Sequence, residues 1–263
     1  MIQEQTSLSH QERKLILSLH KAKGRKEHNL FVAEGPKLVK ELLVAFSCRF
    51  LITIPSLWHS LPKPYTIEKV ILLPESYDFS PISSLQTPRP MIGIFKLPEI
   101  EEEIPTIAQM ALLLDNVQDP GNVGSILRTC DWFGIRQVFV TQGTADVFSP
   151  KVVQATMGGL ARVKVYPIAD IDAFMQRVER ENIPIWGTFL EGENLLDLQS
   201  SLPHPCEPSL WVMGNEGKGI SEQVAKYVTN LVTIPPQSPD GVHSESLNVA
   251  VATAIVIARC FLS

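Results

Sequence analysis

The feature that most constrains the fold is a set of three polar segments that adjoin apolar runs in the second half of the chain. A short apolar run bounded by turn residues is typical of a buried parallel strand. Ligands bind beyond the carboxyl ends of such strands, so the three segments predict one binding site at the rim of a sheet. The segments are residues 115–128, 213–219 and 246–248, which adjoin the apolar runs 108–114, 210–213 and 249–258.

Composition is that of an ordinary globular protein. The chain has 263 residues, of which 44% are hydrophobic and 19% charged, enough for one large domain or two modest ones. The first twenty residues contain no signal-peptide pattern. The longest apolar stretch, Val249 to Ala258, is shorter than the roughly 20 residues that span a bilayer, so we expect it to be a buried core segment.

The four cysteines form no CxxC pair and have no metal-ligand spacing. We therefore expect reduced packing residues, a cytoplasmic location and no metal site. The net charge of −5 argues mildly against nucleic acid, but residues 13–26 hold six Lys or Arg and no acid. That run is either a solvated helix face or the local basic patch that an RNA binder requires.

The first half predicts a small α/β domain over residues 1–97. Residues 98–105 form a proline-bracketed acidic run, which we interpret as a linker, or alternatively as a surface loop within one domain. Residues 106–263 would form the second domain. In the first half we expect helices at 13–22 and 36–46, a break at 23–26, and strands at 31–35, 49–54, 66–73 and 91–97.

In the second half, strands and helices alternate, which predicts a doubly wound parallel sheet. The expected strands are 108–114, 136–140, 163–167, 183–189, 210–213 and 231–234; the expected helices are 122–133, 150–157 and 245–261.

The first polar segment leads into a helix. Asn122 is expected to cap its start and Gly134 its end. Arg128 lies away from the apolar stripe, on a face with small residues (Gly121, Gly124, Ser125). It is either a solvated arginine or a cation that an RNA phosphate can approach.

The second segment, residues 214–219, is a glycine-rich turn. It is not a P-loop, and Glu222 stands where the last glycine of GxGxxG belongs. A tight loop carrying one acid, Glu216, could hold a nucleoside without phosphates, or it is an ordinary turn. In the third segment Asn248 precedes an apolar helix and is expected to be nearly buried and partnered, unless Ser246 makes a local cap.

Read in order, the three segments resemble the motifs of the SpoU-type (TrmH-like) RNA ribose 2′-O-methyltransferases of the SPOUT superfamily. They read DNVQDPGNVGSILRTCDWFGI (115–135), WVMGNEGKGIS (211–221), and IPP with SLNVAVATAIV (234–236 and 246–256). Residues 23–43, KGRKEHNLFVAEGPKLVKELL, are similar to the small substrate-binding domain that precedes the catalytic domain in many members.

The resemblance implies S-adenosylmethionine as methyl donor, an RNA substrate, a homodimer, and a parallel-sheet α/β methyltransferase domain with a C-terminal trefoil knot. Ribosomal RNA is favoured as the substrate, and transfer RNA stays open. The implied catalytic residues are Asn122, Arg128, Glu216, Ser246 and Asn248. The implied cofactor-binding residues are Thr188, Met213, Gly214, Asn215, Gly217, Ile234, Pro235 and Leu247.

Two positions depart from the family pattern. Residues 236–245 are longer than the usual link, and Ala250 stands where the family often has Ser. For the mechanism, a guanidinium with a pKa above about 12 is a poor base. Our hypothesis is that Arg128 fixes the adjacent phosphate and stabilises the developing alkoxide, while Asn122 and Asn248 orient their neighbours. The rival readings are an RNA-binding homologue without catalysis and a methyltransferase acting on a base; the lack of GxGxxG disfavours a dehydrogenase.

Overall fold

The computed structural model describes residues 3–61, 65–99, 103–198, 202–238, 240 and 242–262. The contacts between residues divide the chain into two units, and each unit is made of two separate stretches of sequence. The first unit comprises Met1–Ile100 and Asp146–Arg162, and the second comprises Glu101–Ala145 and Val163–Ser263. Part of the expected linker, residues 100–102, lies outside the described residues.

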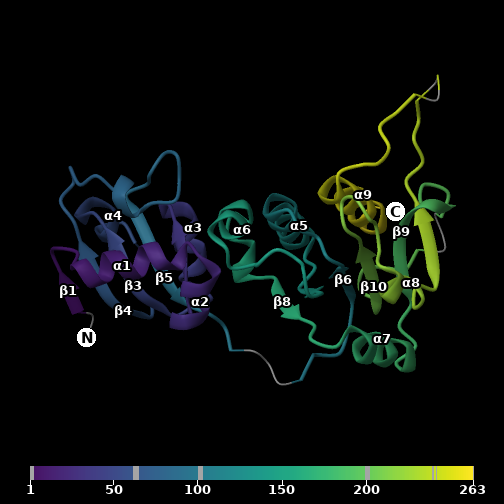
Figure 1. Cartoon of the computed structure of the whole chain (residues 1–263), viewed down its shortest axis with the longest axis horizontal. Helices are drawn as coiled ribbons and strands as arrows, with labels where there is room; N and C mark the ends of the chain where they lie inside the picture. Colours follow the sequence, from purple (N-terminus) through teal and green to yellow (C-terminus); the bar gives the residue numbers. More distant parts are fainter. Residues whose placement is uncertain are drawn as a thin grey trace. The chain divides into compact units, whose positions relative to one another are not determined.

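The first unit contains a five-stranded mixed sheet in the order β1-β4-β3-β5-β2. Four of its strands, β1, β3, β4 and β5, are labelled in Figure 1. Strands β1, β4 and β3 are parallel, and β5 runs antiparallel to both of its neighbours. The strands are β1 (Gln3–Gln5), β2 (Leu30–Glu34), β3 (Cys48–Thr53), β4 (Ile67–Leu72) and β5 (Met91–Lys96). The helices are α1 (His10–Leu19), α2 (Ala22–His28), α3 (Pro36–Leu42), α4 (Pro55–His59) and the short η1 (Ser80–Ile82).

Each face of this sheet has its own apolar core. On one face, Ile16 and Leu19 of α1 join a cluster of aliphatic strand residues. On the other, Phe31 of β2 packs against Phe95 with 5.4 Å between ring centroids and against Phe148 with 5.0 Å. Alternation of side chains along β2 explains how one strand serves both cores.

Phe148 belongs to the segment that the middle of the chain contributes to this unit. The segment contains α6 (Pro150–Ala155) and η2 (Gly159–Ala161). Its start is fixed by Arg25, which is 4% exposed and donates from Nε to Asp146 Oδ2 at 3.1 Å. Its end is fixed by Arg162 Nη1, 2.6 Å from Glu41 Oε2. The contact division therefore differs from the expected continuous domain 106–263, because residues 146–162 pack with the first unit.

Two sequence expectations for the first unit were wrong. The segment Lys23–Lys26 does not break a helix but lies inside α2. Gly24 permits this, because a Cβ there would lie 2.2 Å from the carbonyl oxygen of Ser18. Helix α3 ends at Leu42, four residues before the expected end. The burial of Arg25 also removes one cation from the exposed basic run.

A partly buried ion pair between Lys69 and Glu12 in the first unit predicts an acid-sensitive stability. Burial raises the pKa of Glu12, but hydrogen bonds from Lys69, Ser9 and Gln5 outweigh it and lower that pKa to about 2. A carboxylate with a lowered pKa stabilises the fold above its ordinary pKa and loses this contribution as pH falls to about 2. We expect Lys69→Met to cost about 1 kcal/mol of unfolding free energy at neutral pH, measured by urea denaturation.

The difference between Lys69→Met and the unchanged protein should shrink as pH falls from the ordinary glutamate range toward 2. Lys96→Met is the matched control, because Lys96 and its partner Glu68 are both about half exposed. An equal loss of unfolding free energy in Lys69→Met and Lys96→Met at every pH would contradict a stabilising role for the pair of Lys69 and Glu12.

The second unit contains a six-stranded sheet in the order β11-β9-β10-β6-β7-β8, in which every paired neighbour is parallel. This confirms the predicted parallel sheet. The strands are β6 (Met110–Leu114), β7 (Gln137–Val140), β8 (Lys164–Pro167), β9 (Ile185–Asn194), β10 (Ser209–Met213) and β11 (Asn230–Thr233). The helices are α5 (Pro120–Phe133), α7 (Ile171–Arg180), α8 (Glu222–Ala225) and α9 (Val249–Phe261).

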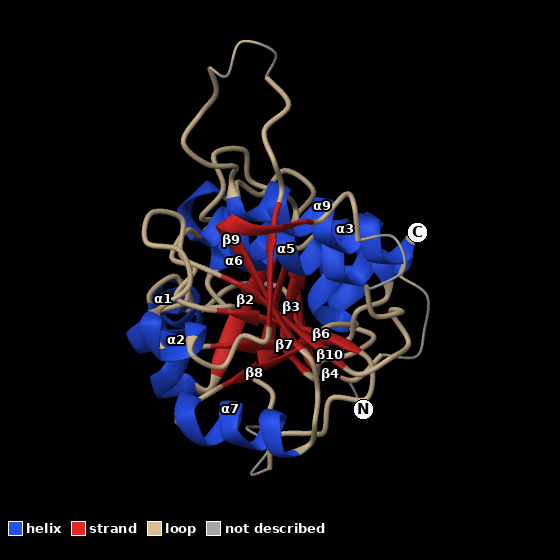
Figure 2. Ribbon diagram, turned by 90° about the vertical axis from the view of Figure 1, so that its right-hand side faces the viewer, coloured by secondary structure: helices blue, strands red, loops and turns tan. Residues whose placement is uncertain are grey.

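Helices cover both faces of this sheet (Figures 1 and 2). Phe174, Met175 and Val178 of α7 pack with strand residues such as Leu113 and Val212 in one core. Helices α5 and α9 lie side by side, since Asn122 contacts Asn248 near their starts and the rings of Phe133 and Phe261 are 5.3 Å apart near their ends. Within the described ranges, no helix has the length and apolarity that a membrane crossing demands.

The ends of α5 and α9 differ from expectation. Helix α5 begins at Pro120, and its N-cap is Asp119 rather than Asn122. Helix α9 begins at Val249 with Asn248 as N-cap, four residues later than expected. Gly134 ends α5 with φ of 81°, which confirms the predicted cap. The buried core segment expected at 249–258 is buried on one face only: Val249, Val256 and Ile257 are buried, but the side chain of Val251 is 48% exposed.

Candidate functional site

Three side chains from the three polar segments meet in one hydrogen-bonded chain. Asn122 Nδ2 donates to Glu216 Oε1 at 2.9 Å, and Asn248 Nδ2 donates to Asn122 Oδ1 at 2.9 Å. The three residues lie on α5, on the loop after β10, and at the start of α9. The predicted meeting of the three segments is therefore present in the structure, and Asn122 is its central member.

Glu216 also binds the backbone that leads into α5. Its two oxygens accept the N–H groups of Gln118 and Asp119, each at 3.3 Å. Burial raises the pKa of Glu216, but the hydrogen bonds from Asn122 and from the backbone outweigh it and hold the pKa below its usual value. The carboxylate is therefore ionised at neutral pH and serves as an acceptor of hydrogen bonds rather than of a proton.

The capping geometry explains why Asn122 is free for this network. Pro120 occupies the first turn of α5, and the side chain of Asp119 accepts the N–H of Asn122 at 2.9 Å. The carboxamide of Asn122 is thus not used as a cap. Asn248, expected to be nearly buried, is exposed, and its Oδ1 caps α9 by accepting the N–H groups of Ala250 and Val251.

The loop after β10 is held in shape by Asn215. Its backbone exchanges two hydrogen bonds of 2.9 Å with Gly219, and its Oδ1 accepts the N–H groups of Gly217 and Lys218 at 3.0 Å. Its Nδ2 donates to the carbonyl of Asn116 at 2.8 Å. One side chain thus fixes the loop internally and joins it to the segment that follows β6.

The glycines of this loop suit a ligand that lies against bare backbone. A Cβ on Gly214 would fall 2.3 Å from the carbonyl carbon of Gly219, so the two strands of the loop cross too closely for any side chain. Gly219 has φ of 70° and meets nothing within 4 Å, and Gly217 meets only Asn215, at 3.8 Å. At Gly217 and Gly219 a ligand could therefore approach the backbone without meeting a side chain of the same residue.

Arg128 projects from an open face of α5. The helical period places it beside Gly121, Ser125 and Trp132, and Arg128, Ser125 and Trp132 are exposed. Gly124, which was expected on this face, is buried instead. Among the residues that the structure describes, Arg128 has no hydrogen-bond or ion-pair partner, and the same holds for the exposed Ser246. The network thus includes three of the five predicted catalytic residues.

Three of the other expected cofactor positions lie on β9 or directly after the edge strand β11, and a fourth precedes α9. Thr188 begins a stretch of β9, residues 188–192, that has no partner in β11, because Leu231 pairs with Gly187 and Val232 pairs with Glu193. Ile234 and Pro235 follow β11 directly, and the side chain of Leu247 is 49% exposed. The expected long link forms an extended loop, with residues 234–238 and 242–248 as its described sides (Figure 2).

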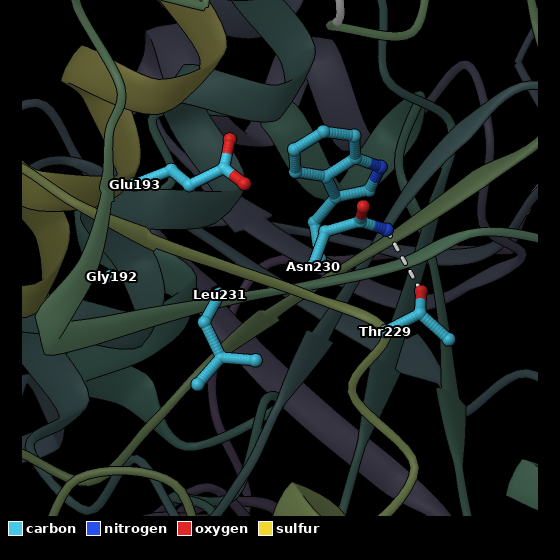
Figure 3. A pocket seen from close by; sticks show the side chains of 6 residues that line it. Gly192, Glu193, Thr229, Asn230 and Leu231 are labelled. Carbon is cyan, nitrogen blue, oxygen red and sulfur yellow. Dashed lines mark hydrogen bonds between the residues drawn. The ribbon is translucent and has the colours of Figure 1, made fainter.

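A pocket of about 370 Å³ opens beside the same two strands (Figure 3). In it, Asn230 Nδ2 donates to Thr229 Oγ1 at 2.8 Å, and the Glu193 carboxylate reaches in from β9. The pocket includes none of the residues expected to bind the cofactor. Within the described part of the chain, no three His, Cys, Asp or Glu side chains gather as a metal site requires. The pocket is lined by Trp186, Gly192, Glu193, Thr229, Asn230 and Leu231.

The sequence reasoning missed four polar residues that hold the site together: Asp115, Asn116, Asp119 and Thr141. Thr141 Oγ1 donates to Asp115 Oδ1 at 3.1 Å and accepts the N–H of Asn116 at 2.9 Å. Asp119 could have been identified, because Asp followed by Pro is a common helix start. Thr141 follows another strand, and no local sequence signal links it to the site.

Comparisons with known proteins identify the family of each half of the chain. The SpoU rRNA methylase family matches residues 109–258, which include the whole hydrogen-bonded chain. An MRM3-like substrate binding domain matches residues 11–93, within the first unit.

Similar proteins cover nearly all of the chain. The 23S rRNA (guanosine(2553)-2′-O)-methyltransferase of Bacillus subtilis is 30% identical, over 91% of this chain and 91% of its own length. A Porphyromonas gingivalis structure assigned to the TrmH family of RNA methyltransferases superposes with a TM-score of 0.90, at 45% identity, over 98% of this chain and 99% of that one. A Sinorhizobium meliloti rRNA methyltransferase solved with S-adenosylmethionine gives 0.77, at 27% identity, over 98% and 97%. The chain belongs to the SpoU family of RNA methyltransferases, which use S-adenosylmethionine.

Proposed function

We propose that this protein transfers a methyl group from S-adenosylmethionine to a ribose 2′-hydroxyl of ribosomal RNA. The observation that carries the proposal is the hydrogen-bonded chain of Asn122, Glu216 and Asn248, which joins all three family motifs in one place. The relative from Bacillus subtilis, which carries out this reaction on 23S rRNA, matches over nearly the full length.

The cofactor would lie against the loop that Asn215 shapes. Its bound sulfonium supplies an electrophilic methyl group, which needs no metal. In the chain, Gly214, Gly217 and Met213 offer backbone at this loop, and Ile234, Pro235 and Leu247 offer backbone and apolar surface from the third motif. Thr188 stands at the unpaired stretch of β9. We assign these residues to cofactor binding.

The side chains at the site offer hydrogen-bond donors rather than a base that titrates near neutral pH. Asn122 and Asn248 each use one amide N–H within the network and retain a second. Arg128 adds a guanidinium fork on the open face of α5. We propose that Arg128 binds the phosphate next to the reacting ribose and stabilises the developing alkoxide. Asn122 and Asn248 orient the hydroxyl, Ser246 binds the ribose, and the proton passes to solvent.

We also propose that two copies of the chain pair through α5 and α9. These helices run side by side, yet Trp132 of α5 (85%), Val251 of α9 (48%) and Leu262, which directly follows α9 (79%), are exposed. Exposed apolar side chains of this size on adjoining helices mark an interaction surface. Arg128 shares the helix face of Trp132, so pairing would place the RNA side of the active site at the junction of the two copies.

Trp132→Glu combined with Val251→Glu should convert the dimer to single chains, because two buried charges would oppose each other across the interface. Light scattering after gel filtration measures the change. Val44→Glu, in the first unit and 79% exposed, is the control and should leave the mass unchanged. A double variant that elutes at the mass of two chains would contradict the proposed interface.

The first unit is proposed as the RNA-binding domain. Arg13, Lys14, Lys21, Lys23 and Lys26 are exposed on α1 and α2 or between them, so the basic run retains five cations after Arg25 is excluded. The family match over residues 11–93 supports this assignment. For the second unit, the likeness to TrmH-family structures supports a trefoil knot near the C-terminus.

The function is tested by mapping ribose methylation in RNA from cells with and without the gene. Loss of one 2′-O-methyl mark from ribosomal RNA is the expected result. Loss from transfer RNA alone would favour the alternative substrate, and loss of a base methyl group would overturn ribose as the target. Calorimetric titration with S-adenosylmethionine separates these outcomes from an RNA-binding homologue without catalysis, which would give no heat of binding.

A further inference from the structure

We propose that Asp115 is the positioning residue of the cofactor loop. Asp115 directly follows β6 and is 4% exposed. Its backbone N–H donates to the carbonyl of Met213 at 2.9 Å, and its Oδ2 accepts the N–H of Ser221 at 2.7 Å. Met213 and Ser221 are the residues on either side of the loop 214–220. A single buried residue therefore holds both ends of the loop.

The two bonds from Asp115 to Met213 and Ser221 are called the clamp below. The other carboxylate oxygen of Asp115, Oδ1, connects this clamp to the residues that follow β6 and β7. Thr141 donates its hydroxyl to Asp115 Oδ1 and accepts the N–H of Asn116. The backbone carbonyl of Asn116 in turn accepts a hydrogen bond from Asn215 Nδ2. The chain from Thr141 through Asp115 to Ser221 thus fixes the loop 214–220 against the segment that leads to Asn122. The inference rests on the proposed function only in naming S-adenosylmethionine as the ligand of this loop.

The clamp has a positioning role because the loop offers backbone, not side chains, to its ligand. The open glycine positions gain affinity only if the backbone is held in one conformation before binding. Removal of the Asp115 carboxylate leaves the N–H of Ser221 without its acceptor and frees one end of the loop. The bonds within the loop, from Asn215 to Gly217, Lys218 and Gly219, would remain.

The test compares Asp115→Ala with Asp115→Asn, Thr141→Val and Thr229→Val. In Asp115→Asn, the amide oxygen can still accept the N–H of Ser221. The Thr141 hydroxyl would then donate to the carbonyl of Leu114 and accept an N–H of the new amide. We expect the Kd for S-adenosylmethionine to rise at least 10-fold in Asp115→Ala, about threefold in Thr141→Val, and less than threefold in Asp115→Asn. Thr229→Val is the stability control, because it removes two hydrogen bonds to Ile185 at the far end of β9.

Two measurements, calorimetric titration and amide hydrogen exchange, are made on each full-length variant. Amide exchange in residues 214–221 should be faster in Asp115→Ala and Thr141→Val than in the unchanged protein. It should not be faster in Thr229→Val, even where that variant loses as much melting temperature as the other two. Equal exchange of this loop in Asp115→Ala and Thr229→Val would overturn the clamp. If Asp115→Ala does not fold, the contrast between Thr141→Val and Thr229→Val decides in the same way. Faster loop exchange together with no cofactor binding by the unchanged protein would refute the proposed function and leave the clamp standing.

Discussion

Replacement of Arg128 by alanine is expected to reduce methyl transfer by about 10²–10³-fold while the Kd for S-adenosylmethionine stays within twofold. The loss matches the removal of one preorganised donor to a developing negative charge. The Kd for S-adenosylmethionine should stay unchanged because Arg128 lies on the open face of α5 and forms no bond to the described residues of the loop 214–219. Transfer of tritiated methyl groups to ribosomal RNA from cells lacking the gene measures the rate.

Two further variants sharpen this result. Arg128→Lys keeps the charge but loses the planar fork, so its rate should fall between those of the alanine variant and the unchanged protein. Arg136→Ala is the matched control, since Arg136 is an exposed arginine just beyond the end of α5, bonded to Asp131. Full turnover by Arg128→Ala would remove Arg128 from the mechanism.

Replacement of Glu216 by alanine is expected to lower methyl transfer by about 10²-fold and unfolding free energy by about 1 kcal/mol, because the groups that it binds are exposed to solvent. The substitution leaves the N–H groups of Gln118 and Asp119 and the amide of Asn122 without their shared acceptor. Asn122 then loses its fixed orientation toward Asn248. Single-turnover rates measure the first effect and urea denaturation the second.

The pH dependence separates this role from general base catalysis. Because the pKa of Glu216 is lowered in the fold, its carboxylate contributes stability above the ordinary glutamate pKa and loses it only as pH falls through the lowered value. The rate between pH 6 and 9 should therefore show no inflection that Glu216→Gln abolishes. An inflection near neutral pH that disappears in Glu216→Gln would make Glu216 the base.

The sequence allowed a good prediction of the site but not of the bonds that hold it. The order of strands and polar segments predicted that Asn122, Glu216 and Asn248 would meet, because ends of parallel strands share one rim. It placed the N-cap of α5 wrongly at Asn122, since either Asp119 or Asn122 could cap a helix. Turn propensities alone do not choose between them, and Pro120 in the first turn decides for Asp119.

The least predictable features depend on contacts between residues distant in the sequence. Nothing in the pattern of α6 distinguishes a helix of the second unit from one that packs on β2 of the first. The exposure of Val251 could not be predicted either, because the sequence pattern of an apolar helix face is the same whether the face packs on its own sheet or is exposed to a partner.

The placement of residues 146–162 in the first unit has a consequence for synthesis on the ribosome. A domain made only of residues 1–100 could complete its core as soon as that stretch left the exit tunnel. Here Phe31 lacks Phe148, and Arg25 lacks Asp146, until nearly fifty further residues have been made. The nascent first unit must wait with part of one apolar face uncovered, so a chaperone that protects such surfaces would find its longest window between the emergence of residues 100 and 162.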